Sequence, residues 1–212
     1  MKYLTFLLIS GLLVPPGVQA HDAAHGAPAA TAATPAPKLQ ATLRTLWHGH
    51  VDRTRQYALA VHANDARRSE AAASAVVANA RQLADAVGSF YGAPAGERML
   101  ALLAGHWGAV KAMTDAGHGG NRAAGEAAMA TLTQNAGEIA VFLSSANPYL
   151  PQDAVRGLLL AHGAHHAAQI EQLMRGDRAA EAKTWAAMQA HMDVIADAMA
   201  GALAKQFPGK VS

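Results

Sequence analysis

The feature that most constrains the fold of this chain is a threefold internal repeat with a period of 56 residues. One repeat position carries only histidine, at His50, His106 and His162. A second position carries amide or imidazole side chains, at Asn79, Asn135 and His191. A fixed period of this size indicates one supersecondary unit copied along the chain.

The repeated unit is predicted to be a helical hairpin. The midpoints between the paired polar positions fall in residues typical of turns: Asn64-Asp65, Gly120-Asn121 and Gly176-Asp177. The segments between these turns are rich in Ala, Leu, Met, Gln and Glu, which favour helices. We therefore expect an all-α, up-and-down bundle of six helices in residues 39–208, built from hairpins at 39–92, 94–147 and 151–207.

The polar repeat positions are expected to face the interior of this bundle. On the first predicted helix, His50 continues an apolar stripe that includes Leu43 and Leu46, and the later helices show the same spacing. Residues equally far from a turn lie level on antiparallel helices, so the six polar side chains should form one layer. The expected buried polar set beside the histidines is Asn79, Asn135 and Glu138.

The chain begins with a segment typical of an export signal. Residues 1–20 combine Lys2, an apolar run over 3–14 and the small-residue sequence Val18-Gln19-Ala20, which predicts cleavage after Ala20. A periplasmic or secreted location follows from this interpretation. Residues 21–38 are predicted to be a flexible leader, in which His21 and His25 either chelate Cu(II) or have no role.

Composition excludes several kinds of protein. The sequence has no cysteine, so disulfides and thiolate metal sites are excluded. A formal net charge of +2 argues against a nucleic-acid partner, which usually requires a strongly basic face. After residue 20 no apolar run is long enough to predict a membrane span.

Several short motifs resemble those of a largely uncharacterised family of bacterial helical proteins. They are Leu46-Trp47 followed by His50-Val51 and Thr54-Arg55, then Asn147-Pro148 and the closing Gln206-Phe207-Pro208. The resemblance covers nearly all of residues 43–208 and implies the same repeated helical fold. It implies no particular chemistry, and this chain differs from the family in its leader and in the run from His162 to His166.

A buried polar layer must be satisfied, because a buried imidazole without a partner costs about 1–3 kcal/mol. One interpretation is mutual hydrogen bonding, of His50 with Asn79 and of His106 with Asn135. Such pairs would only fix the register of the helices, and the protein would then be a non-enzymatic structural or interaction protein.

The other interpretation is a transition-metal site. In the third repeat His191 faces His162, His166 lies one turn further along the same helix, and Met188 precedes His191 by three residues. We predict a metal ion at His162, His166, His191 and Met188, with His106 and His50 as further ligands. Three imidazoles suit zinc, and imidazole with methionine sulfur suits copper, which places copper slightly ahead of zinc.

Enzymatic activity is less expected than metal binding. The sequence contains no Gly-x-Ser-x-Gly, no phosphate-binding glycine loop and no His-Glu-x-x-His. A carboxylate-bridged diiron centre would need several acids at one level, and Glu138 has no histidine at the required spacing. No catalytic residue is predicted.

Overall fold

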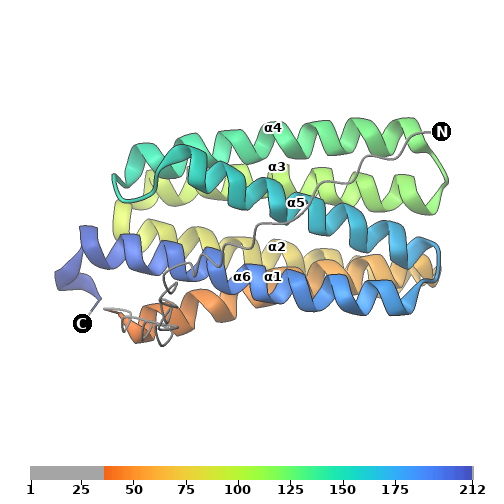
Figure 1. Ribbon diagram of the computed structural model, residues 1–212, viewed down its shortest axis with the longest axis horizontal. Helices are drawn as coiled ribbons and strands as arrows, with labels where there is room; N and C mark the ends of the chain where they lie inside the picture. The colour runs from red at the N-terminus through yellow and green to blue at the C-terminus, as the bar shows by residue number, and fades with distance from the viewer. Residues whose placement is uncertain (1–35, 212) are drawn as a thin grey trace, which may run out of the picture. The chain divides into compact units, whose positions relative to one another are not determined.

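The computed structural model describes residues 36–211, which form an all-α bundle (Figure 1). Six helices follow one another along the chain: α1 (Pro37–His62), α2 (Ala66–Tyr91), α3 (Ala93–His118), α4 (Arg122–Ala146), α5 (Gln152–Met174) and α6 (Arg178–Gln206). A short 3-10 turn, η1 (Pro208–Lys210), follows the last helix. The predicted fold class is therefore confirmed. None of the helices described is both long and apolar enough to cross a membrane.

The turn inside each hairpin has the same construction. A residue in the left-handed region ends the first helix: Asn64 with φ 56°, Gly120 with φ 66° and Gly176 with φ 72°. The next residue caps the second helix through its side-chain oxygen, which accepts a hydrogen bond from the backbone N–H three residues on, at Asp65, Asn121 and Asp177. These caps satisfy N–H groups that the first helical turn leaves free, so the turns lie where the sequence placed them.

The first helix begins slightly earlier than expected. Pro37 is at the first helical position of α1, where its fixed φ suits the helix and its missing N–H removes no bond. Residues 37 and 38 therefore belong to the bundle and not to the leader predicted at 21–38. The predicted signal at 1–20 and residues 21–35 lie outside the described residues.

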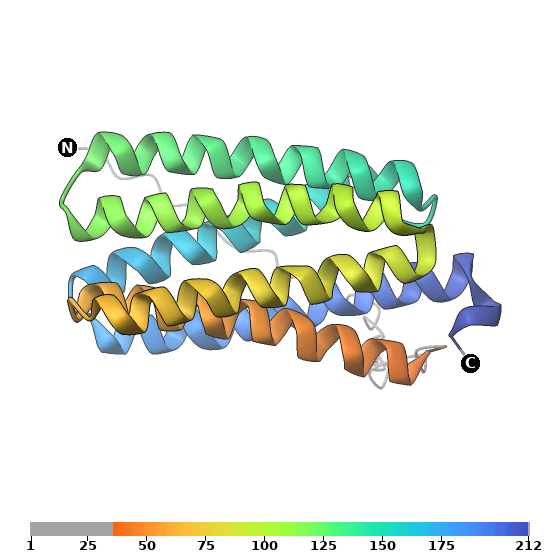
Figure 2. The same cartoon turned by 180° about the vertical axis from the view of Figure 1, so that it is seen from behind.

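The odd-numbered helices are the inner ones. Each helix packs against its neighbours in the chain, and α6 packs against α1, which closes the ring. In addition α1, α3 and α5 all contact one another. Figures 1 and 2 show the six helices running side by side from opposite views, with α5 crossing the bundle obliquely. Side chains on the inward faces of α1, α3 and α5 consequently point toward one common axis.

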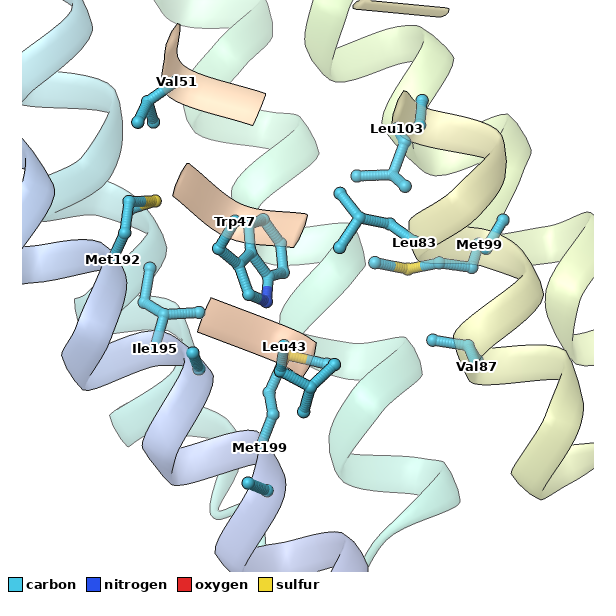
Figure 3. Close-up of a cluster of buried hydrophobic side chains, with 14 of the residues drawn as sticks. Leu43, Trp47, Val51, Leu83, Val87, Met99, Leu103, Met192, Ile195 and Met199 are labelled. Carbon is cyan, nitrogen blue, oxygen red and sulfur yellow. The ribbon is translucent and has the colours of Figure 1, made fainter. Parts of the chain in front are cut away.

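Three apolar clusters fill the interior of the described bundle, and two of them lie on either side of the repeat histidines. The larger surrounds the Trp47 indole, with Leu43, Met99, Ile195 and Met199 packed near it (Figure 3). The smaller includes Tyr57, Val110 and Ile170, farther along the inner helices. On α3, His106 lies between Leu103 of the first cluster and Val110 of the second. The histidines therefore lie at mid-length in the bundle, between these two apolar clusters.

Candidate metal centre

Four histidine side chains meet on the axis between the inner helices. His50 comes from α1, His106 from α3, and His162 and His166 from successive turns of α5. Their exposed fractions are only 1–3%. One ring nitrogen from each lies within 4.8 Å of the corresponding nitrogens of the other three. The prediction that the repeat histidines face inward at one level is confirmed.

The four imidazole rings are packed directly against one another. His106 and His162 are stacked, with ring centroids 5.4 Å apart and an angle of 10° between the planes. The ring of His50 lies 5.8 Å from His106 and 5.7 Å from His162. His166 meets His162 edge to face at 4.4 Å, and their Nε2 atoms are 3.1 Å apart. One of these two nitrogens must carry a proton for this contact to be a hydrogen bond.

Most of the other ring nitrogens have no hydrogen-bond partner among the described residues. These buried, unpaired atoms are Nδ1 of His50, both nitrogens of His106, and Nδ1 of His162 and of His166. Each such atom has lost its hydrogen bonds to water without replacement, at about 1–3 kcal/mol. A group that accepts several imidazole lone pairs at once would satisfy part of this cluster.

Burial keeps these imidazoles neutral. Removal from water lowers the pKa of His50 from 6.5 to about 3, with repulsion from His106 adding to the shift. Burial also lowers the pKa of His106 to about 4. The pKa values of His162 and His166 are lowered well below 6.5, first by burial and then by repulsion between the histidines. Neutral imidazole is the form that binds metals.

The second polar repeat position bonds to the backbone of the preceding helix. The Asn79 amide donates to the Leu46 carbonyl at 3.1 Å, and the Asn135 amide donates to the Leu102 carbonyl at 3.0 Å. Nε2 of His191 lies 2.8 Å from the Leu158 carbonyl in the equivalent contact. The expected His50–Asn79 and His106–Asn135 hydrogen bonds are therefore not formed, because a helix carbonyl lies within reach of each amide.

The other predicted site residues have different surroundings. Asn79 and Asn135 are buried as expected. His191 is only partly buried and does not belong to the group of four; its ring lies 5.5 Å from that of His165. Met188 is fully buried in the apolar cluster around Trp47. The prediction for Glu138 was wrong, because its carboxylate is exposed and accepts a hydrogen bond from Gln134 one turn earlier.

A buried ion pair between α1 and α6 was not predicted. Arg55 donates from Nε and Nη2 to the carboxylate of Glu181, at 2.6 and 2.8 Å. Gln169, one turn beyond His166 on α5, donates to the same carboxylate at 2.9 Å. Glu181 is only 2% exposed, and the guanidinium of Arg55 lies over the Trp185 ring. Arg55 belongs to the Thr54-Arg55 motif, but no spacing in the sequence relates it to Glu181 and Gln169, which only the packing of three helices brings to it.

An apolar cavity of about 290 Å³ lies against the histidine cluster. Side chains of His50, His106 and His162 line it, whereas that of His166 does not. Most of its remaining lining is aliphatic or aromatic, including Trp47 and Leu159. The buried histidines therefore adjoin a space that is large enough to hold a small molecule.

Comparison with models of protein families, with curated proteins and with solved structures found no match for this chain.

Proposed function

We propose that this chain is an exported protein that binds one transition-metal ion, copper or zinc, through His50, His106, His162 and His166. One observation carries the proposal. Four buried imidazoles from three helices place ligand atoms within 4.8 Å of one another, while most of their remaining nitrogens have no hydrogen-bond partner. The export signal expected in residues 1–20 supports a periplasmic location, where such an ion would be taken up outside the cytoplasm.

The chemistry of the four ligands selects the class of ion. Neutral imidazole nitrogen suits zinc and copper, whereas magnesium and calcium prefer oxygen ligands. A tetrahedral zinc ion with Zn–N distances of 2.0–2.1 Å would hold its nitrogens about 3.3 Å apart. Nε2 of His162 and Nε2 of His166 are already 3.1 Å apart. All four ligand nitrogens already lie within 4.8 Å of one another, so each pair needs to approach by at most about 1.5 Å to reach this spacing.

The structural alternative is supported by a separate set of residues. Asn79, Asn135 and His191 each bond to a carbonyl of the preceding helix, which fixes the register within every hairpin. The four clustered histidines take no part in these bonds. A polar layer needed only for register could therefore have apolar residues at positions 50, 106, 162 and 166, and this favours metal binding as the role of the histidines.

Metal titration tests the proposal. Protein stripped with a chelator should bind one equivalent of Zn²⁺ or of copper, measured by calorimetry and by elemental analysis after gel filtration. The variants His106→Leu and His162→Leu should lose that equivalent while keeping the helical circular dichroism. His118→Ala is the matched control, since His118 is exposed, lies outside the cluster of four and is hydrogen-bonded to Asn64. A His25→Ala variant shows whether His25 of the predicted leader contributes to the bound metal.

The same titration can contradict the proposal. If the stripped protein takes up no stoichiometric zinc or copper, or if His106→Leu and His162→Leu bind as much as the unaltered chain, the four histidines are not a metal site. The two metals are distinguished by competition, since the preferred ion should displace the other from the folded protein.

A further inference from the structure

The cavity beside the histidines is closed at one end by imidazole and open at the other between α5 and α6. His50, His106 and His162 form its inner end, while Ala154 on α5 and Ala198 on α6 line it and are exposed. In Figure 1, α5 starts beside α4 and approaches α6 only toward its own C-terminal end. The outer end of the cavity lies between the parts of these helices that diverge, and the lining extends from there to the three histidines.

The arrangement of the four ligands leaves one side of a bound ion facing this cavity. Three of the imidazoles line the space and the fourth, His166, lies behind them on α5. Protein ligands therefore lie at the inner end of the cavity; beyond them the lining is mostly aliphatic or aromatic, with the thioether sulfurs of Met99 and Met199 as soft donors. Copper(II) and zinc also accept a fifth ligand, so an ion held by four imidazoles can take one from the side of the cavity.

The charges around the cavity favour an anion as that outside ligand. A copper(II) or zinc ion among four neutral imidazoles keeps its full charge, and an uncompensated charge in apolar surroundings is strongly disfavoured. Asp197 is the one acidic residue among the described residues lining the cavity, and its carboxylate is already paired with Arg44 at 2.8 and 2.6 Å. Lys205 lines the outer end, is exposed and lies over the Tyr149 ring.

We infer that the cavity binds a small, mainly apolar monocarboxylate whose carboxylate completes the coordination of the metal ion. The inference rests on the proposed metal site and adds the chemical class of its ligand. An apolar cavity of about 150 Å³ binds benzene, so a space of twice that size accommodates about twelve non-hydrogen atoms. The apolar body contacts side chains such as Leu159 and Ile195, and Lys205 attracts the carboxylate on its way in.

The test uses 4-phenylbutyrate, which has the required size and charge, with protein loaded with Co²⁺ as a spectroscopic substitute for zinc. Binding should shift the visible d–d bands of cobalt and should be about tenfold or more tighter than binding to metal-free protein. The uncharged 4-phenylbutan-1-ol should bind more weakly and leave the bands nearly unchanged. Acetate, which lacks the apolar body, should require far higher concentrations.

A matched pair of variants locates the ligand. Ala198→Phe places a large side chain at the outer end of the cavity, at an exposed position that tolerates it in the fold. It should weaken 4-phenylbutyrate binding about tenfold or more and leave metal affinity unchanged. Ala190→Phe makes the same change at an exposed position of α6 that does not line the cavity, and it should bind like the unaltered protein.

The outcomes separate this inference from the metal site itself. Protein that binds cobalt or zinc but shows no band shift with 4-phenylbutyrate overturns the inference and leaves the proposed function intact. Equal binding by Ala198→Phe and Ala190→Phe also overturns it, because the ligand is then held elsewhere. Protein that binds no metal at all removes the proposed function, and this inference with it.

Discussion

At the scale of single residues, the four central histidines are unusual for a protein core, because their ring nitrogens are buried and mostly unpaired within the described part of the chain. Their rings are almost fully buried, and His106 has no hydrogen-bond partner at either nitrogen among the described residues. Unpaired imidazoles destabilise the fold, because their nitrogens have lost hydrogen bonds to water. A metal ion bound to these nitrogens removes that desolvation cost. The metal-free protein should therefore be less stable than its apolar packing alone would make it.

Substitution of His106 separates these two effects. His106→Leu removes two unpaired nitrogens while roughly preserving side-chain volume, so it should stabilise the metal-free protein by about 1–3 kcal/mol. The same variant should lose the added stability that zinc or copper gives to the unaltered chain. Urea unfolding of both proteins, with and without metal, measures the two quantities. A large loss of stability in metal-free His106→Leu would mean that the imidazole already has a partner.

The lowered pKa values of these histidines predict a stability that falls with acid. In the unfolded chain each imidazole takes up a proton below pH 6.5, whereas in the fold His50 and His106 do so only near pH 3 and pH 4. The unfolded state therefore binds more protons in this window. Each histidine that stays neutral in the fold lowers the free energy of unfolding by about 1.4 kcal/mol for every pH unit below 6.5.

Unfolding of metal-free protein between pH 7.5 and pH 4 measures this dependence. The slope below pH 6.5 should be smaller by one proton in His106→Leu. A stability that stays constant from pH 6.5 to pH 4.5 would show that the central rings are protonated in the fold.

At the scale of the helices, two arginine–carboxylate pairs join α1 to α6 with the same two-pronged geometry. Arg55 binds Glu181 and Arg44 binds Asp197. The surroundings differ, because the side chain of Glu181 is 2% exposed and that of Asp197 is 36% exposed. Loss of a partner leaves a buried carboxylate in the first case and a hydrated one in the second.

The more exposed Arg44–Asp197 pair serves as the control for the buried Arg55–Glu181 pair. Arg55→Met should destabilise the protein by about 3 kcal/mol, since Glu181 would keep only its bond from Gln169. Arg44→Met should cost much less, because water hydrates the freed Asp197 carboxylate. Thermal unfolding of the two variants at pH 7 compares them, and equal costs would indicate that water reaches Glu181.

The hairpins could be predicted from the sequence, but which helices lie inside the bundle could not. Asn64-Asp65, Gly120-Asn121 and Gly176-Asp177 identified the turns because a left-handed residue followed by a capping side chain has few alternatives. The period of 56 residues does not show whether the odd-numbered or the even-numbered helices lie inside. Only the packing of α1, α3 and α5 against one another explains why His166 joins the cluster and His191 does not.

The wrong predictions for individual residues also have local causes. Glu138 lies three residues after Asn135, and this spacing alone suggested an inward direction; the helix turns it to solvent beside Gln134. The amides of Asn79 and Asn135 bind carbonyls, because every helix offers carbonyls and a sequence pattern does not show which lie within reach. The cavity depends on the divergence of α5 from α6, which no residue pattern indicates.

At the scale of the whole molecule, metal binding should raise thermal stability. An ion that binds only the folded state at a hundred times its dissociation constant adds about 2.7 kcal/mol, which corresponds to about 5–10 °C in Tm for a chain of this length. Scanning calorimetry with Zn²⁺, and again after addition of a chelator, should show the increase and its reversal. His162→Leu should show no increase; a similar increase in that variant would place the ion elsewhere.

The placement of one ligand helix in each hairpin also affects how the chain would assemble. His50, His106 and His162 are separated by equal lengths of chain, and each belongs to a different hairpin. A captured ion would thus tether three segments that are otherwise joined only by short links and lateral packing. Like a cross-link that closes long loops, it would restrict the denatured chain, and local separation of one hairpin from the others could not proceed without release of the ion.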